Sequence, residues 1–218
     1  MKTMRLLGTV CLATLLLAGC SSRTEHGEHA WRQQAEAVCM AKGNFASAYV
    51  QRIQRIRGNG PCGIWQPLKV SAALGGMIAF SQPETLNCPM TSALDGWFWH
   101  SVQPAALKTF GVPVVEVRTM GAYNCRTRNH RRGARLSEHA FGNAFDVAAF
   151  RLSDGREISV QRGWRGEPDE QVFLREIHRG ACSMFTTVIG PDGDRHHQDH
   201  FHLDLARHNA TGTHRVCR

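Results

Sequence analysis

The sequence predicts an α+β fold, in which helices pack on one face of a small antiparallel sheet and the other face carries a polar cleft. Two patterns lead to this prediction. Short stretches that alternate apolar and polar residues are typical of antiparallel strands with one buried face. Longer stretches repeat apolar residues every three or four positions, as helices with one buried face do. The chain has 218 residues, enough for one domain with an N-terminal extension.

The elements follow along the chain. Periodicity and composition indicate helices over residues 31–42, 46–56, 89–110 and 170–185. Gly43 ends the first helix, and Asn87 or Thr91 caps the third. Pro67 should confine the first strand to a sheet edge. Strands are expected over residues 65–70, 113–120, 143–152, 157–160, 186–189 and 200–206.

The first residues form an export signal. Lys2 and Arg5 precede an apolar run over residues 6–17, which is too short to span a bilayer as a retained helix. The sequence Leu-Ala-Gly-Cys at 17–20 resembles the cleavage box of bacterial lipoproteins, which implies that residues 1–19 are removed and that Cys20 is lipidated. Polar residues 20–30 are then expected to be a tether, and residues 31–218 the folded domain.

The expected cellular location follows from the same cleavage sequence. Ser21 stands where lipoproteins of the inner membrane usually carry aspartate, which implies the periplasmic side of the outer membrane of a Gram-negative cell. The alternative is a plain secretory signal cut nearby, with the protein free in the periplasm. An exported chain rarely meets nucleic acid, so the net charge of +8 is not interpreted as a nucleic-acid footprint. We expect a monomer.

The cysteine count agrees with export. Of eight cysteines, Cys11 leaves with the signal and Cys20 would be lipidated, which leaves an even set of six in an oxidising compartment. Three disulfides are therefore expected, although about fifteen pairings are open. A cysteine zinc site is disfavoured because the chain has no C-x-x-C pair. Our assignment is Cys39 with Cys62, Cys88 with Cys125, and Cys182 with Cys217.

Two short runs hold the residue types that a catalytic zinc site needs, namely three nitrogen or oxygen ligands. The first is S-E-H-A-F-G-N-A-F-D at 137–146, and the second is H-Q-D-H-F-H-L-D at 197–204. Alternation places His200, His202 and Asp204 on one strand face. Asp146 likewise shares a face with small alanines, which leave room for a metal and a substrate.

The pattern S-x-H-x-x-G-x-A-x-D followed by H-x-H resembles zinc peptidases that cut peptidoglycan peptides: the D-Ala-D-Ala carboxypeptidases and dipeptidases and the penicillin-insensitive murein endopeptidases. From about Cys62 onward the chain also resembles the bacterial extensin-like C-terminal domain family, an offshoot of that superfamily. The resemblance implies a D-Ala-D-Ala peptidase/Hedgehog-like fold. It also implies one Zn²⁺ per chain, with His139, Asp146 and His202 as its ligands.

The resemblance also suggests the other roles. Many carboxypeptidases of the superfamily place a glutamate base three residues before the last histidine ligand, where this chain has Asp199. On a strand Asp199 faces away from His202, so we expect His200 to be the general base, ahead of His197 and then Asp199.

Arginines stand one segment before the first motif, where the peptidases carry a substrate-binding arginine in the pattern S-G-Y-R. This chain departs from that pattern, because Asn and Cys separate Tyr123 from Arg126. Arg126 is therefore our first choice for binding substrate and Arg128 the second, while a merely basic loop is the alternative. Asp204 either orients a histidine ligand or is a surface aspartate.

The expected function is zinc-dependent hydrolysis of amide bonds in peptidoglycan stem peptides or crosslinks. The alternative is a non-catalytic envelope lipoprotein that binds peptidoglycan and keeps the geometry of the metal site. The membrane anchor, the basic surface and the missing glutamate favour this alternative. Zinc scavenging is a third, weaker hypothesis, because it rests only on the twelve histidines.

Overall fold

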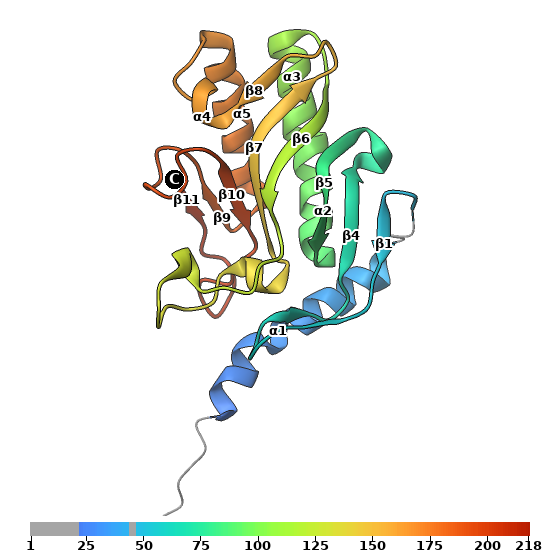
Figure 1. Cartoon of the computed structure of the whole chain (residues 1–218), viewed down its shortest axis with the longest axis vertical. Helices are drawn as coiled ribbons and strands as arrows, with labels where there is room; N and C mark the ends of the chain where they lie inside the picture. Colours follow the sequence, from blue (N-terminus) through green and yellow to red (C-terminus); the bar gives the residue numbers. More distant parts are fainter. Residues whose placement is uncertain (1–21, 44–46) are drawn as a thin grey trace, which may run out of the picture.

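A mixed sheet forms the body of the fold (Figure 1). The computed structural model describes residues 22–43 and 47–218. Within them the sheet has nine strands in the order β1-β4-β5-β6-β7-β10-β9-β11, with β8 also paired to β7. A separate small hairpin joins β2 (Ile56–Arg57) to β3 (Gly63–Ile64). The strands of the large sheet are β1 Val50–Arg52, β4 Leu68–Ala73, β5 Ile78–Leu86, β6 Val114–Gly121, β7 Ala144–Leu152, β8 Glu157–Ser159, β9 Thr187–Ile189, β10 Phe201–Asp204 and β11 Val216–Cys217.

The predicted α+β fold is confirmed, but the sheet is neither small nor wholly antiparallel. The sheet is large, and β5 pairs with β6 in parallel, as does β9 with β11. A long helical crossover joins β5 to β6, and such a connection lets two strands run in the same direction. Strand β5 was missed because its polar middle, with Pro83, hides the alternation. Strand β4 is not an edge strand, since it begins just after Pro67 and lies between β1 and β5.

Helices cover one face of the sheet. The predicted helix over 89–110 is confirmed as a continuous stretch: α2 (Cys88–Trp97), the π-helix η2 (Phe98–Val102) and α3 (Gln103–Phe110). Asn87 caps α2, because its side chain accepts a hydrogen bond from the amide of Met90 at 2.9 Å. The predicted helix over 170–185 is confirmed as α5 (Pro168–Met184), and the short α4 (Val160–Gly163) precedes it. Short 3-10 turns complete the list: η1 Leu74–Gly76, η3 Arg128–His130 and η4 Glu138–Phe141.

The core lies between these helices and the sheet. Trp97 and Phe98 are fully buried in the same core as strand residues such as Phe145 and Phe201. These strand residues alternate with Asp146 and His202, which therefore point to the opposite face. Alternation along β7 and β10 thus separates a hydrophobic core from a polar site.

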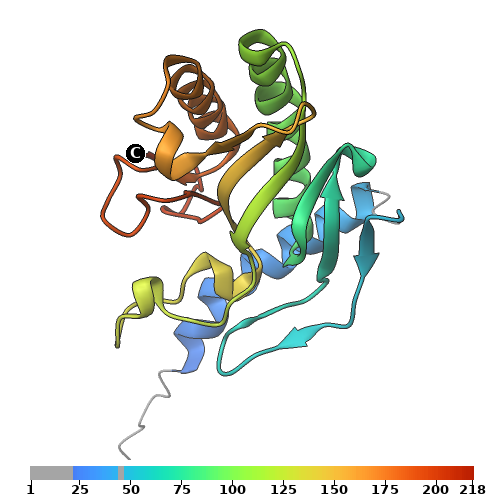
Figure 2. The same cartoon turned by 45° about the horizontal axis from the view of Figure 1, so that its top comes forward.

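Helix α1 (Ser22–Lys42) lies across one end of the sheet (Figures 1 and 2). It ends just before Gly43, as predicted, but it begins within residues 20–30, which we expected to be a tether. The helix predicted over 46–56 is absent from the described part of that stretch, which holds β1 and begins β2. The β-branched Val50 pairs with Val70 of β4, so strand pairing outweighs a weak helical signal. None of the described helices has the length and apolar character to cross a membrane.

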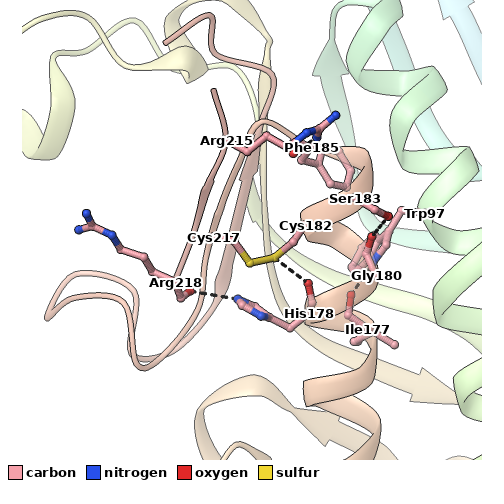
Figure 3. Close-up of a disulfide and its surroundings, with 10 residues drawn as sticks. All are labelled: Trp97, Ile177, His178, Gly180, Cys182, Ser183, Phe185, Arg215, Cys217 and Arg218. Atoms are coloured by element: carbon pink, nitrogen blue, oxygen red, sulfur yellow. Dashed lines mark hydrogen bonds between the residues drawn. A yellow bond between two sulfur atoms is a disulfide. The ribbon is translucent and has the colours of Figure 1, made fainter. Parts of the chain in front are cut away.

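Three disulfides join the six cysteines, and two of the predicted pairings were wrong. Cys182–Cys217 is confirmed and ties β11 to α5 (Figure 3). Instead of Cys39–Cys62 and Cys88–Cys125, the bonds are Cys39–Cys88 and Cys62–Cys125, with Cα–Cα distances of 5.9 and 5.7 Å. The reason is packing: the end of α1 lies against the start of α2, and the β2–β3 hairpin lies against the loop after β6. Nothing in cysteine spacing reports such contacts.

Candidate metal centre

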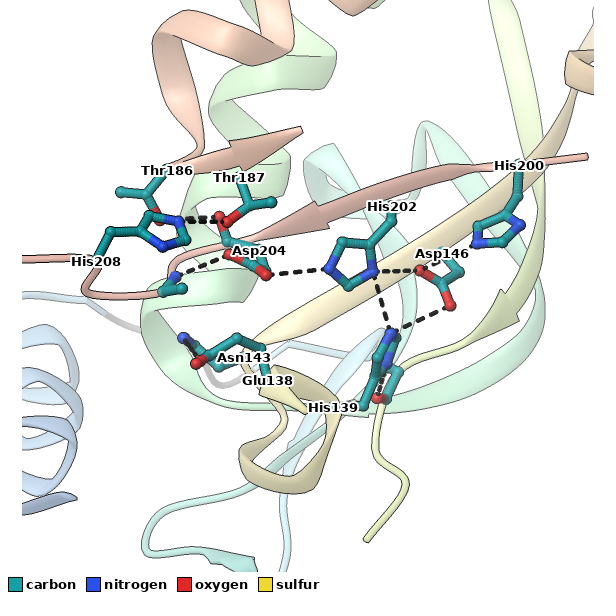
Figure 4. A network of polar contacts seen from close by, with 12 residues as sticks. Glu138, His139, Asn143, Asp146, Thr186, Thr187, His200, His202, Asp204 and His208 are labelled. Carbon is teal, nitrogen blue, oxygen red and sulfur yellow. Dashed lines mark hydrogen bonds and ion pairs between the residues drawn. The ribbon is translucent and has the colours of Figure 1, made fainter. Parts of the chain in front are cut away.

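Strand pairing and one tight turn bring three side chains together. Asp146 on β7 and His202 on β10 are directly opposite in the antiparallel register, so their side chains share a face. His139 comes from η4, and the chain then reverses at Gly142, which has a φ of +57°. A Cβ atom at Gly142 would also collide with Ile64, so this turn needs glycine. The predicted ligands His139, Asp146 and His202 therefore meet on the face of the sheet opposite the core (Figure 4).

The distances within this cluster suit a tetrahedral metal ion. His139 Nε2 lies 3.1 Å from Asp146 Oδ2 and 3.3 Å from His202 Nδ1. His202 Nδ1 lies 2.9 Å from Asp146 Oδ1. Donor atoms around tetrahedral zinc are about 3.3 Å apart, since zinc–nitrogen bonds are about 2.0–2.1 Å long. The three side chains are thus spaced as ligands of one ion.

The outer contacts of the two histidines aim their lone pairs into the cluster. His139 Nδ1 donates to the carbonyl oxygen of Ala122 at 2.5 Å, which leaves Nε2 as an acceptor in the neutral ring. His202 Nε2 donates to Asp204 Oδ2 at 3.0 Å, which leaves Nδ1 as an acceptor. With the Asp146 carboxylate, three acceptors then face one another with no donor between them. The facing lone pairs repel one another unless a positive charge, either a proton or a metal ion, lies among them. The donor set therefore fits Zn²⁺.

The electrostatics of the cluster agree with a cation site. Burial by itself would raise the pKa of Asp146, but the charge and hydrogen bonds of His139 and His202 hold that pKa well below its usual range. Burial likewise opposes protonation of His202, yet its bonds to Asp146 and Asp204 raise the pKa of the ring to about 10, so that without a metal a proton on Nδ1 supplies the positive charge of the cluster. The carboxylates therefore stay charged in a buried place and attract positive charge. Asp204 is one of the orienting residues, which decides the alternative left open by the sequence.

The three predicted proton-transfer residues lie differently. His200 Nε2 faces the cluster, 3.8 Å from Asp146 Oδ1, while its Nδ1 lies 2.7 Å from Asp199 Oδ1. Asp199 itself is half exposed and does not line the cleft; it contacts the far side of His200. His197 lines the cleft, with its Nδ1 2.7 Å from Asp194. His200 thus has a ring nitrogen 3.8 Å from Asp146, and the ring of His197 lies 5.5 Å from that of His202.

A cleft of about 350 Å³ opens over the cluster. Arg126 and Arg128, the predicted substrate-binding residues, both line it. Within residues 22–43 and 47–218 neither arginine forms an ion pair with a carboxylate. Two guanidinium groups beside this cluster of candidate metal ligands are well placed to bind a carboxylate of a substrate.

Sequence reasoning missed the contacts that hold η4 in place. Arg32 on α1 donates two hydrogen bonds, of 2.6 and 2.7 Å, to the buried carboxylate of Glu138, the neighbour of His139. Asn143 donates to the same carboxylate at 2.6 Å and accepts from Asn87 at 2.9 Å. These contacts fasten the His139 turn to α1 and to the start of α2. Arg32 lies 106 residues before Glu138, and no local pattern links the two.

A second group with metal-type atoms needs a different interpretation. His178, Cys182 and Cys217 also lie close together, but the two sulfur atoms form a disulfide (Figure 3). Disulfide sulfurs are not thiolates, and thiolate is the form that binds metals. His178 Nε2 lies 3.0 Å from the carbonyl oxygen of Arg218, to which it donates. This histidine is a structural contact of the C-terminus.

Comparison with known proteins adds the family. The family model for the C-terminus of extensin-like proteins matches residues 37–218. The chain belongs to the extensin-like C-terminus family. No curated protein and no solved structure matches it. The match covers the sheet, the cluster of His139, Asp146 and His202, and all three disulfides, whereas Arg32 and Glu36 on α1 lie before it.

Proposed function

We propose that this extensin-like protein is a zinc-dependent peptidase that hydrolyses amide bonds of peptidoglycan stem peptides or crosslinks. The proposal is carried by one observation: three buried acceptors, on His139, Asp146 and His202, converge beside a cleft lined by Arg126 and Arg128, and neither arginine forms an ion pair with a carboxylate of the described residues. The likeness of the motifs to the D-Ala-D-Ala peptidases supports the same interpretation. The proposed cofactor is one Zn²⁺ per chain.

The residues of the cluster and the residues predicted to act in the cleft each have a proposed task. His139, Asp146 and His202 hold the metal, and Ala122 and Asp204 keep the two rings turned toward it. When bound, Zn²⁺ polarises a carbonyl group and lowers the pKa of water.

His200 takes the proton of the attacking water and returns it to the leaving amine. Its Nδ1 donates to Asp199, so Nε2 is the basic atom and lies on the side of the cluster. His197 is the nearest substitute for this role. Arg126 and Arg128 bind a carboxylate of the stem peptide and thereby place the scissile amide over the metal site.

The proposed place of action is the periplasmic side of the outer membrane, with Cys20 as the lipid-bearing residue and peptidoglycan as the partner. Cys20 and the signal residues 1–19 lie outside the described residues. We propose that the protein acts there as a monomer.

A non-catalytic peptidoglycan-binding lipoprotein is the second candidate. One observation favours it: the carboxylate that corresponds to the usual glutamate base, Asp199, is turned to His200 and does not line the cleft. If His200 does not replace that base, the cleft can bind wall peptides without cutting them.

Zinc content and cell-wall digestion separate the two candidates. The purified chain should carry about one zinc, and His139→Ala should lose it, whereas the exposed His100→Ala should keep it. With zinc present, a peptidase releases peptides from purified sacculi, and both a chelator and His202→Ala stop the release. Zinc binding together with retention on sacculi and no released peptide would favour the binding protein. A folded, disulfide-bonded chain without zinc would refute the metal centre.

A further inference from the structure

A second groove lies beside the metal cleft, on the other side of the Arg32–Glu138 ion pair. Glu138 lines the metal cleft, and Arg32 lines this groove, which has a volume of about 540 Å³. Its walls are one side of α1 and the β2–β3 hairpin, which lie at the same end of the molecule (Figure 2). The groove is larger than the metal cleft, and the proposed reaction does not use it.

The groove carries unpaired positive charge. Arg55 and Arg57 line it, and within the described ranges 22–43 and 47–218 neither forms an ion pair. Desolvation and then the charge of Arg57 lower the pKa of Arg55, so the two guanidinium groups lie close enough to repel each other. The carboxyl group among the described lining residues is that of Glu36, and burial raises its pKa to about 7, so it offsets little of the charge of the two arginines. The groove therefore keeps an excess of positive charge, which stabilises an anion.

A buried donor points to the same groove. The side chain of Arg32 is only 10% exposed, and its two terminal nitrogens bind Glu138. Its third nitrogen, Nε, is buried and has no hydrogen-bond partner among the described residues. Buried donors are nearly always paired, so an unpaired one at a groove wall indicates an acceptor supplied by a ligand.

The groove also has an apolar side. Ile56, Pro61 and Ile64 line it together with the ring of Trp65, which is 41% exposed. The guanidinium of Arg55 stacks over that ring, 3.0 Å from its centre, which holds the cation in one place. A ligand that matches both features has a flat ring with one apolar face and a negatively charged group at its edge.

We propose that this groove binds a sugar acid, a saccharide ring with a free carboxylate. Arg55 and Arg57 hold the carboxylate, the ring lies against the apolar wall, and Arg32 Nε donates to a ring or hydroxyl oxygen. The choice of a sugar among carboxylates rests on the proposed function, because glycan strands accompany the peptides that the metal cleft would cut. The carboxylate can come from a muramyl residue without its peptide or from a uronic acid.

Titration calorimetry on the full chain in detergent tests the proposal with four small probes. N-acetylmuramic acid and glucuronic acid carry both ring and carboxylate, N-acetylglucosamine has only the ring, and lactate has only the carboxylate. At least one sugar acid should bind about tenfold more tightly than either single-feature probe. The tighter of the two acids identifies the source. No sugar binding, or equal binding of N-acetylglucosamine or lactate, would overturn the proposal.

Two controls place the ligand. Arg57→Gln, an exposed hairpin residue, should abolish the tenfold advantage, whereas Arg179→Gln, which removes the same charge from the exposed side of α5, should keep it. Chelating the metal changes no side chain and should leave sugar binding intact. Loss of binding on chelation would put the carboxylate at the metal centre and overturn the groove. Sugar binding by a chain that cuts no cell wall would refute the peptidase and leave this inference standing.

Discussion

Replacing Asp204 by asparagine tests whether the contacts behind the histidines set the metal affinity. Both oxygens of this buried carboxylate accept hydrogen bonds, Oδ2 from His202 Nε2 at 3.0 Å and Oδ1 from the amide of Ala206 at 2.9 Å. Asparagine has one acceptor oxygen and an NH₂ group that only donates. Either orientation of the amide therefore sets a donor against one of these two N–H groups.

The consequence for the metal follows from the ring. If the amide NH₂ faces His202, the ring can accept only by moving its proton to Nδ1, the atom that faces His139 and Asp146. A protonated Nδ1 cannot bind a metal. We expect the zinc dissociation constant to rise about 10–100-fold, or about 1.4–2.7 kcal/mol. Competition with a chromophoric chelator at neutral pH measures the change.

A matched variant controls for a general effect on zinc affinity of removing one negative charge. Asp192→Asn removes a carboxylate from an exposed ion pair with Arg165 and should leave zinc affinity unchanged. Equal zinc affinity in Asp204→Asn and the wild-type chain would refute the reasoning, because it would show that His202 keeps its orientation without Asp204.

Three further predictions concern stability and turnover. Arg32→Met leaves Glu138 buried without its partner and should cost about 3–5 kcal/mol in urea unfolding. Lys108→Met, which breaks an exposed pair, should cost less than about 1 kcal/mol, and equally small losses would contradict the buried pair's role. Burial raises the pKa of Glu36 from 4.5 to about 7, so the folded protein favours the protonated carboxyl group. The contribution of this group to the free energy of unfolding is fully present below about pH 4.5 and is lost as pH rises through 7. The loss should be about 3 kcal/mol, and unfolding of Glu36→Gln should lack this pH dependence; a wild-type curve that is equally flat would disprove it. His200→Gln should lower kcat on a soluble stem peptide about 100–10,000-fold with little change in KM, and an unchanged kcat would exclude His200 as the base.

The arrangement of the site could be predicted because it depends on local geometry. Alternation fixes which residues of 144–152 and 201–204 share a face, and the antiparallel pairing of β7 with β10 then sets Asp146 opposite His202. Gly142, which permits the turn after His139, stands in the first of the two motifs. The same alternation predicted that the side chain of Asp199 points away from that of His202, but it did not predict the contact of Asp199 with His200.

The remaining features depend on contacts between distant segments. Strand β5 is formed because β4 and β6 flank it, while its own residues around Pro83 argue against a strand. The cysteine pairs depend on how α1 lies against α2. The position of α1 also brings Arg32 to Glu138, so the sequence alone did not predict the ion pair that holds the His139 turn in place. Tertiary packing decides these features, and propensity along the chain is a weak guide to it.

Helix α1 has a consequence for the distance between the membrane and the cleft. It comprises 21 residues, which is about 30 Å of rigid rod, and it starts two residues after Cys20. Its second half is fixed to the domain by the Cys39–Cys88 bond and by Arg32. A flexible tether would let a lipid-anchored domain sample many heights above the bilayer. If Cys20 carries the lipid, as we propose, this rod instead holds the cleft at one height, so that only the layer of cell wall at that height comes within reach.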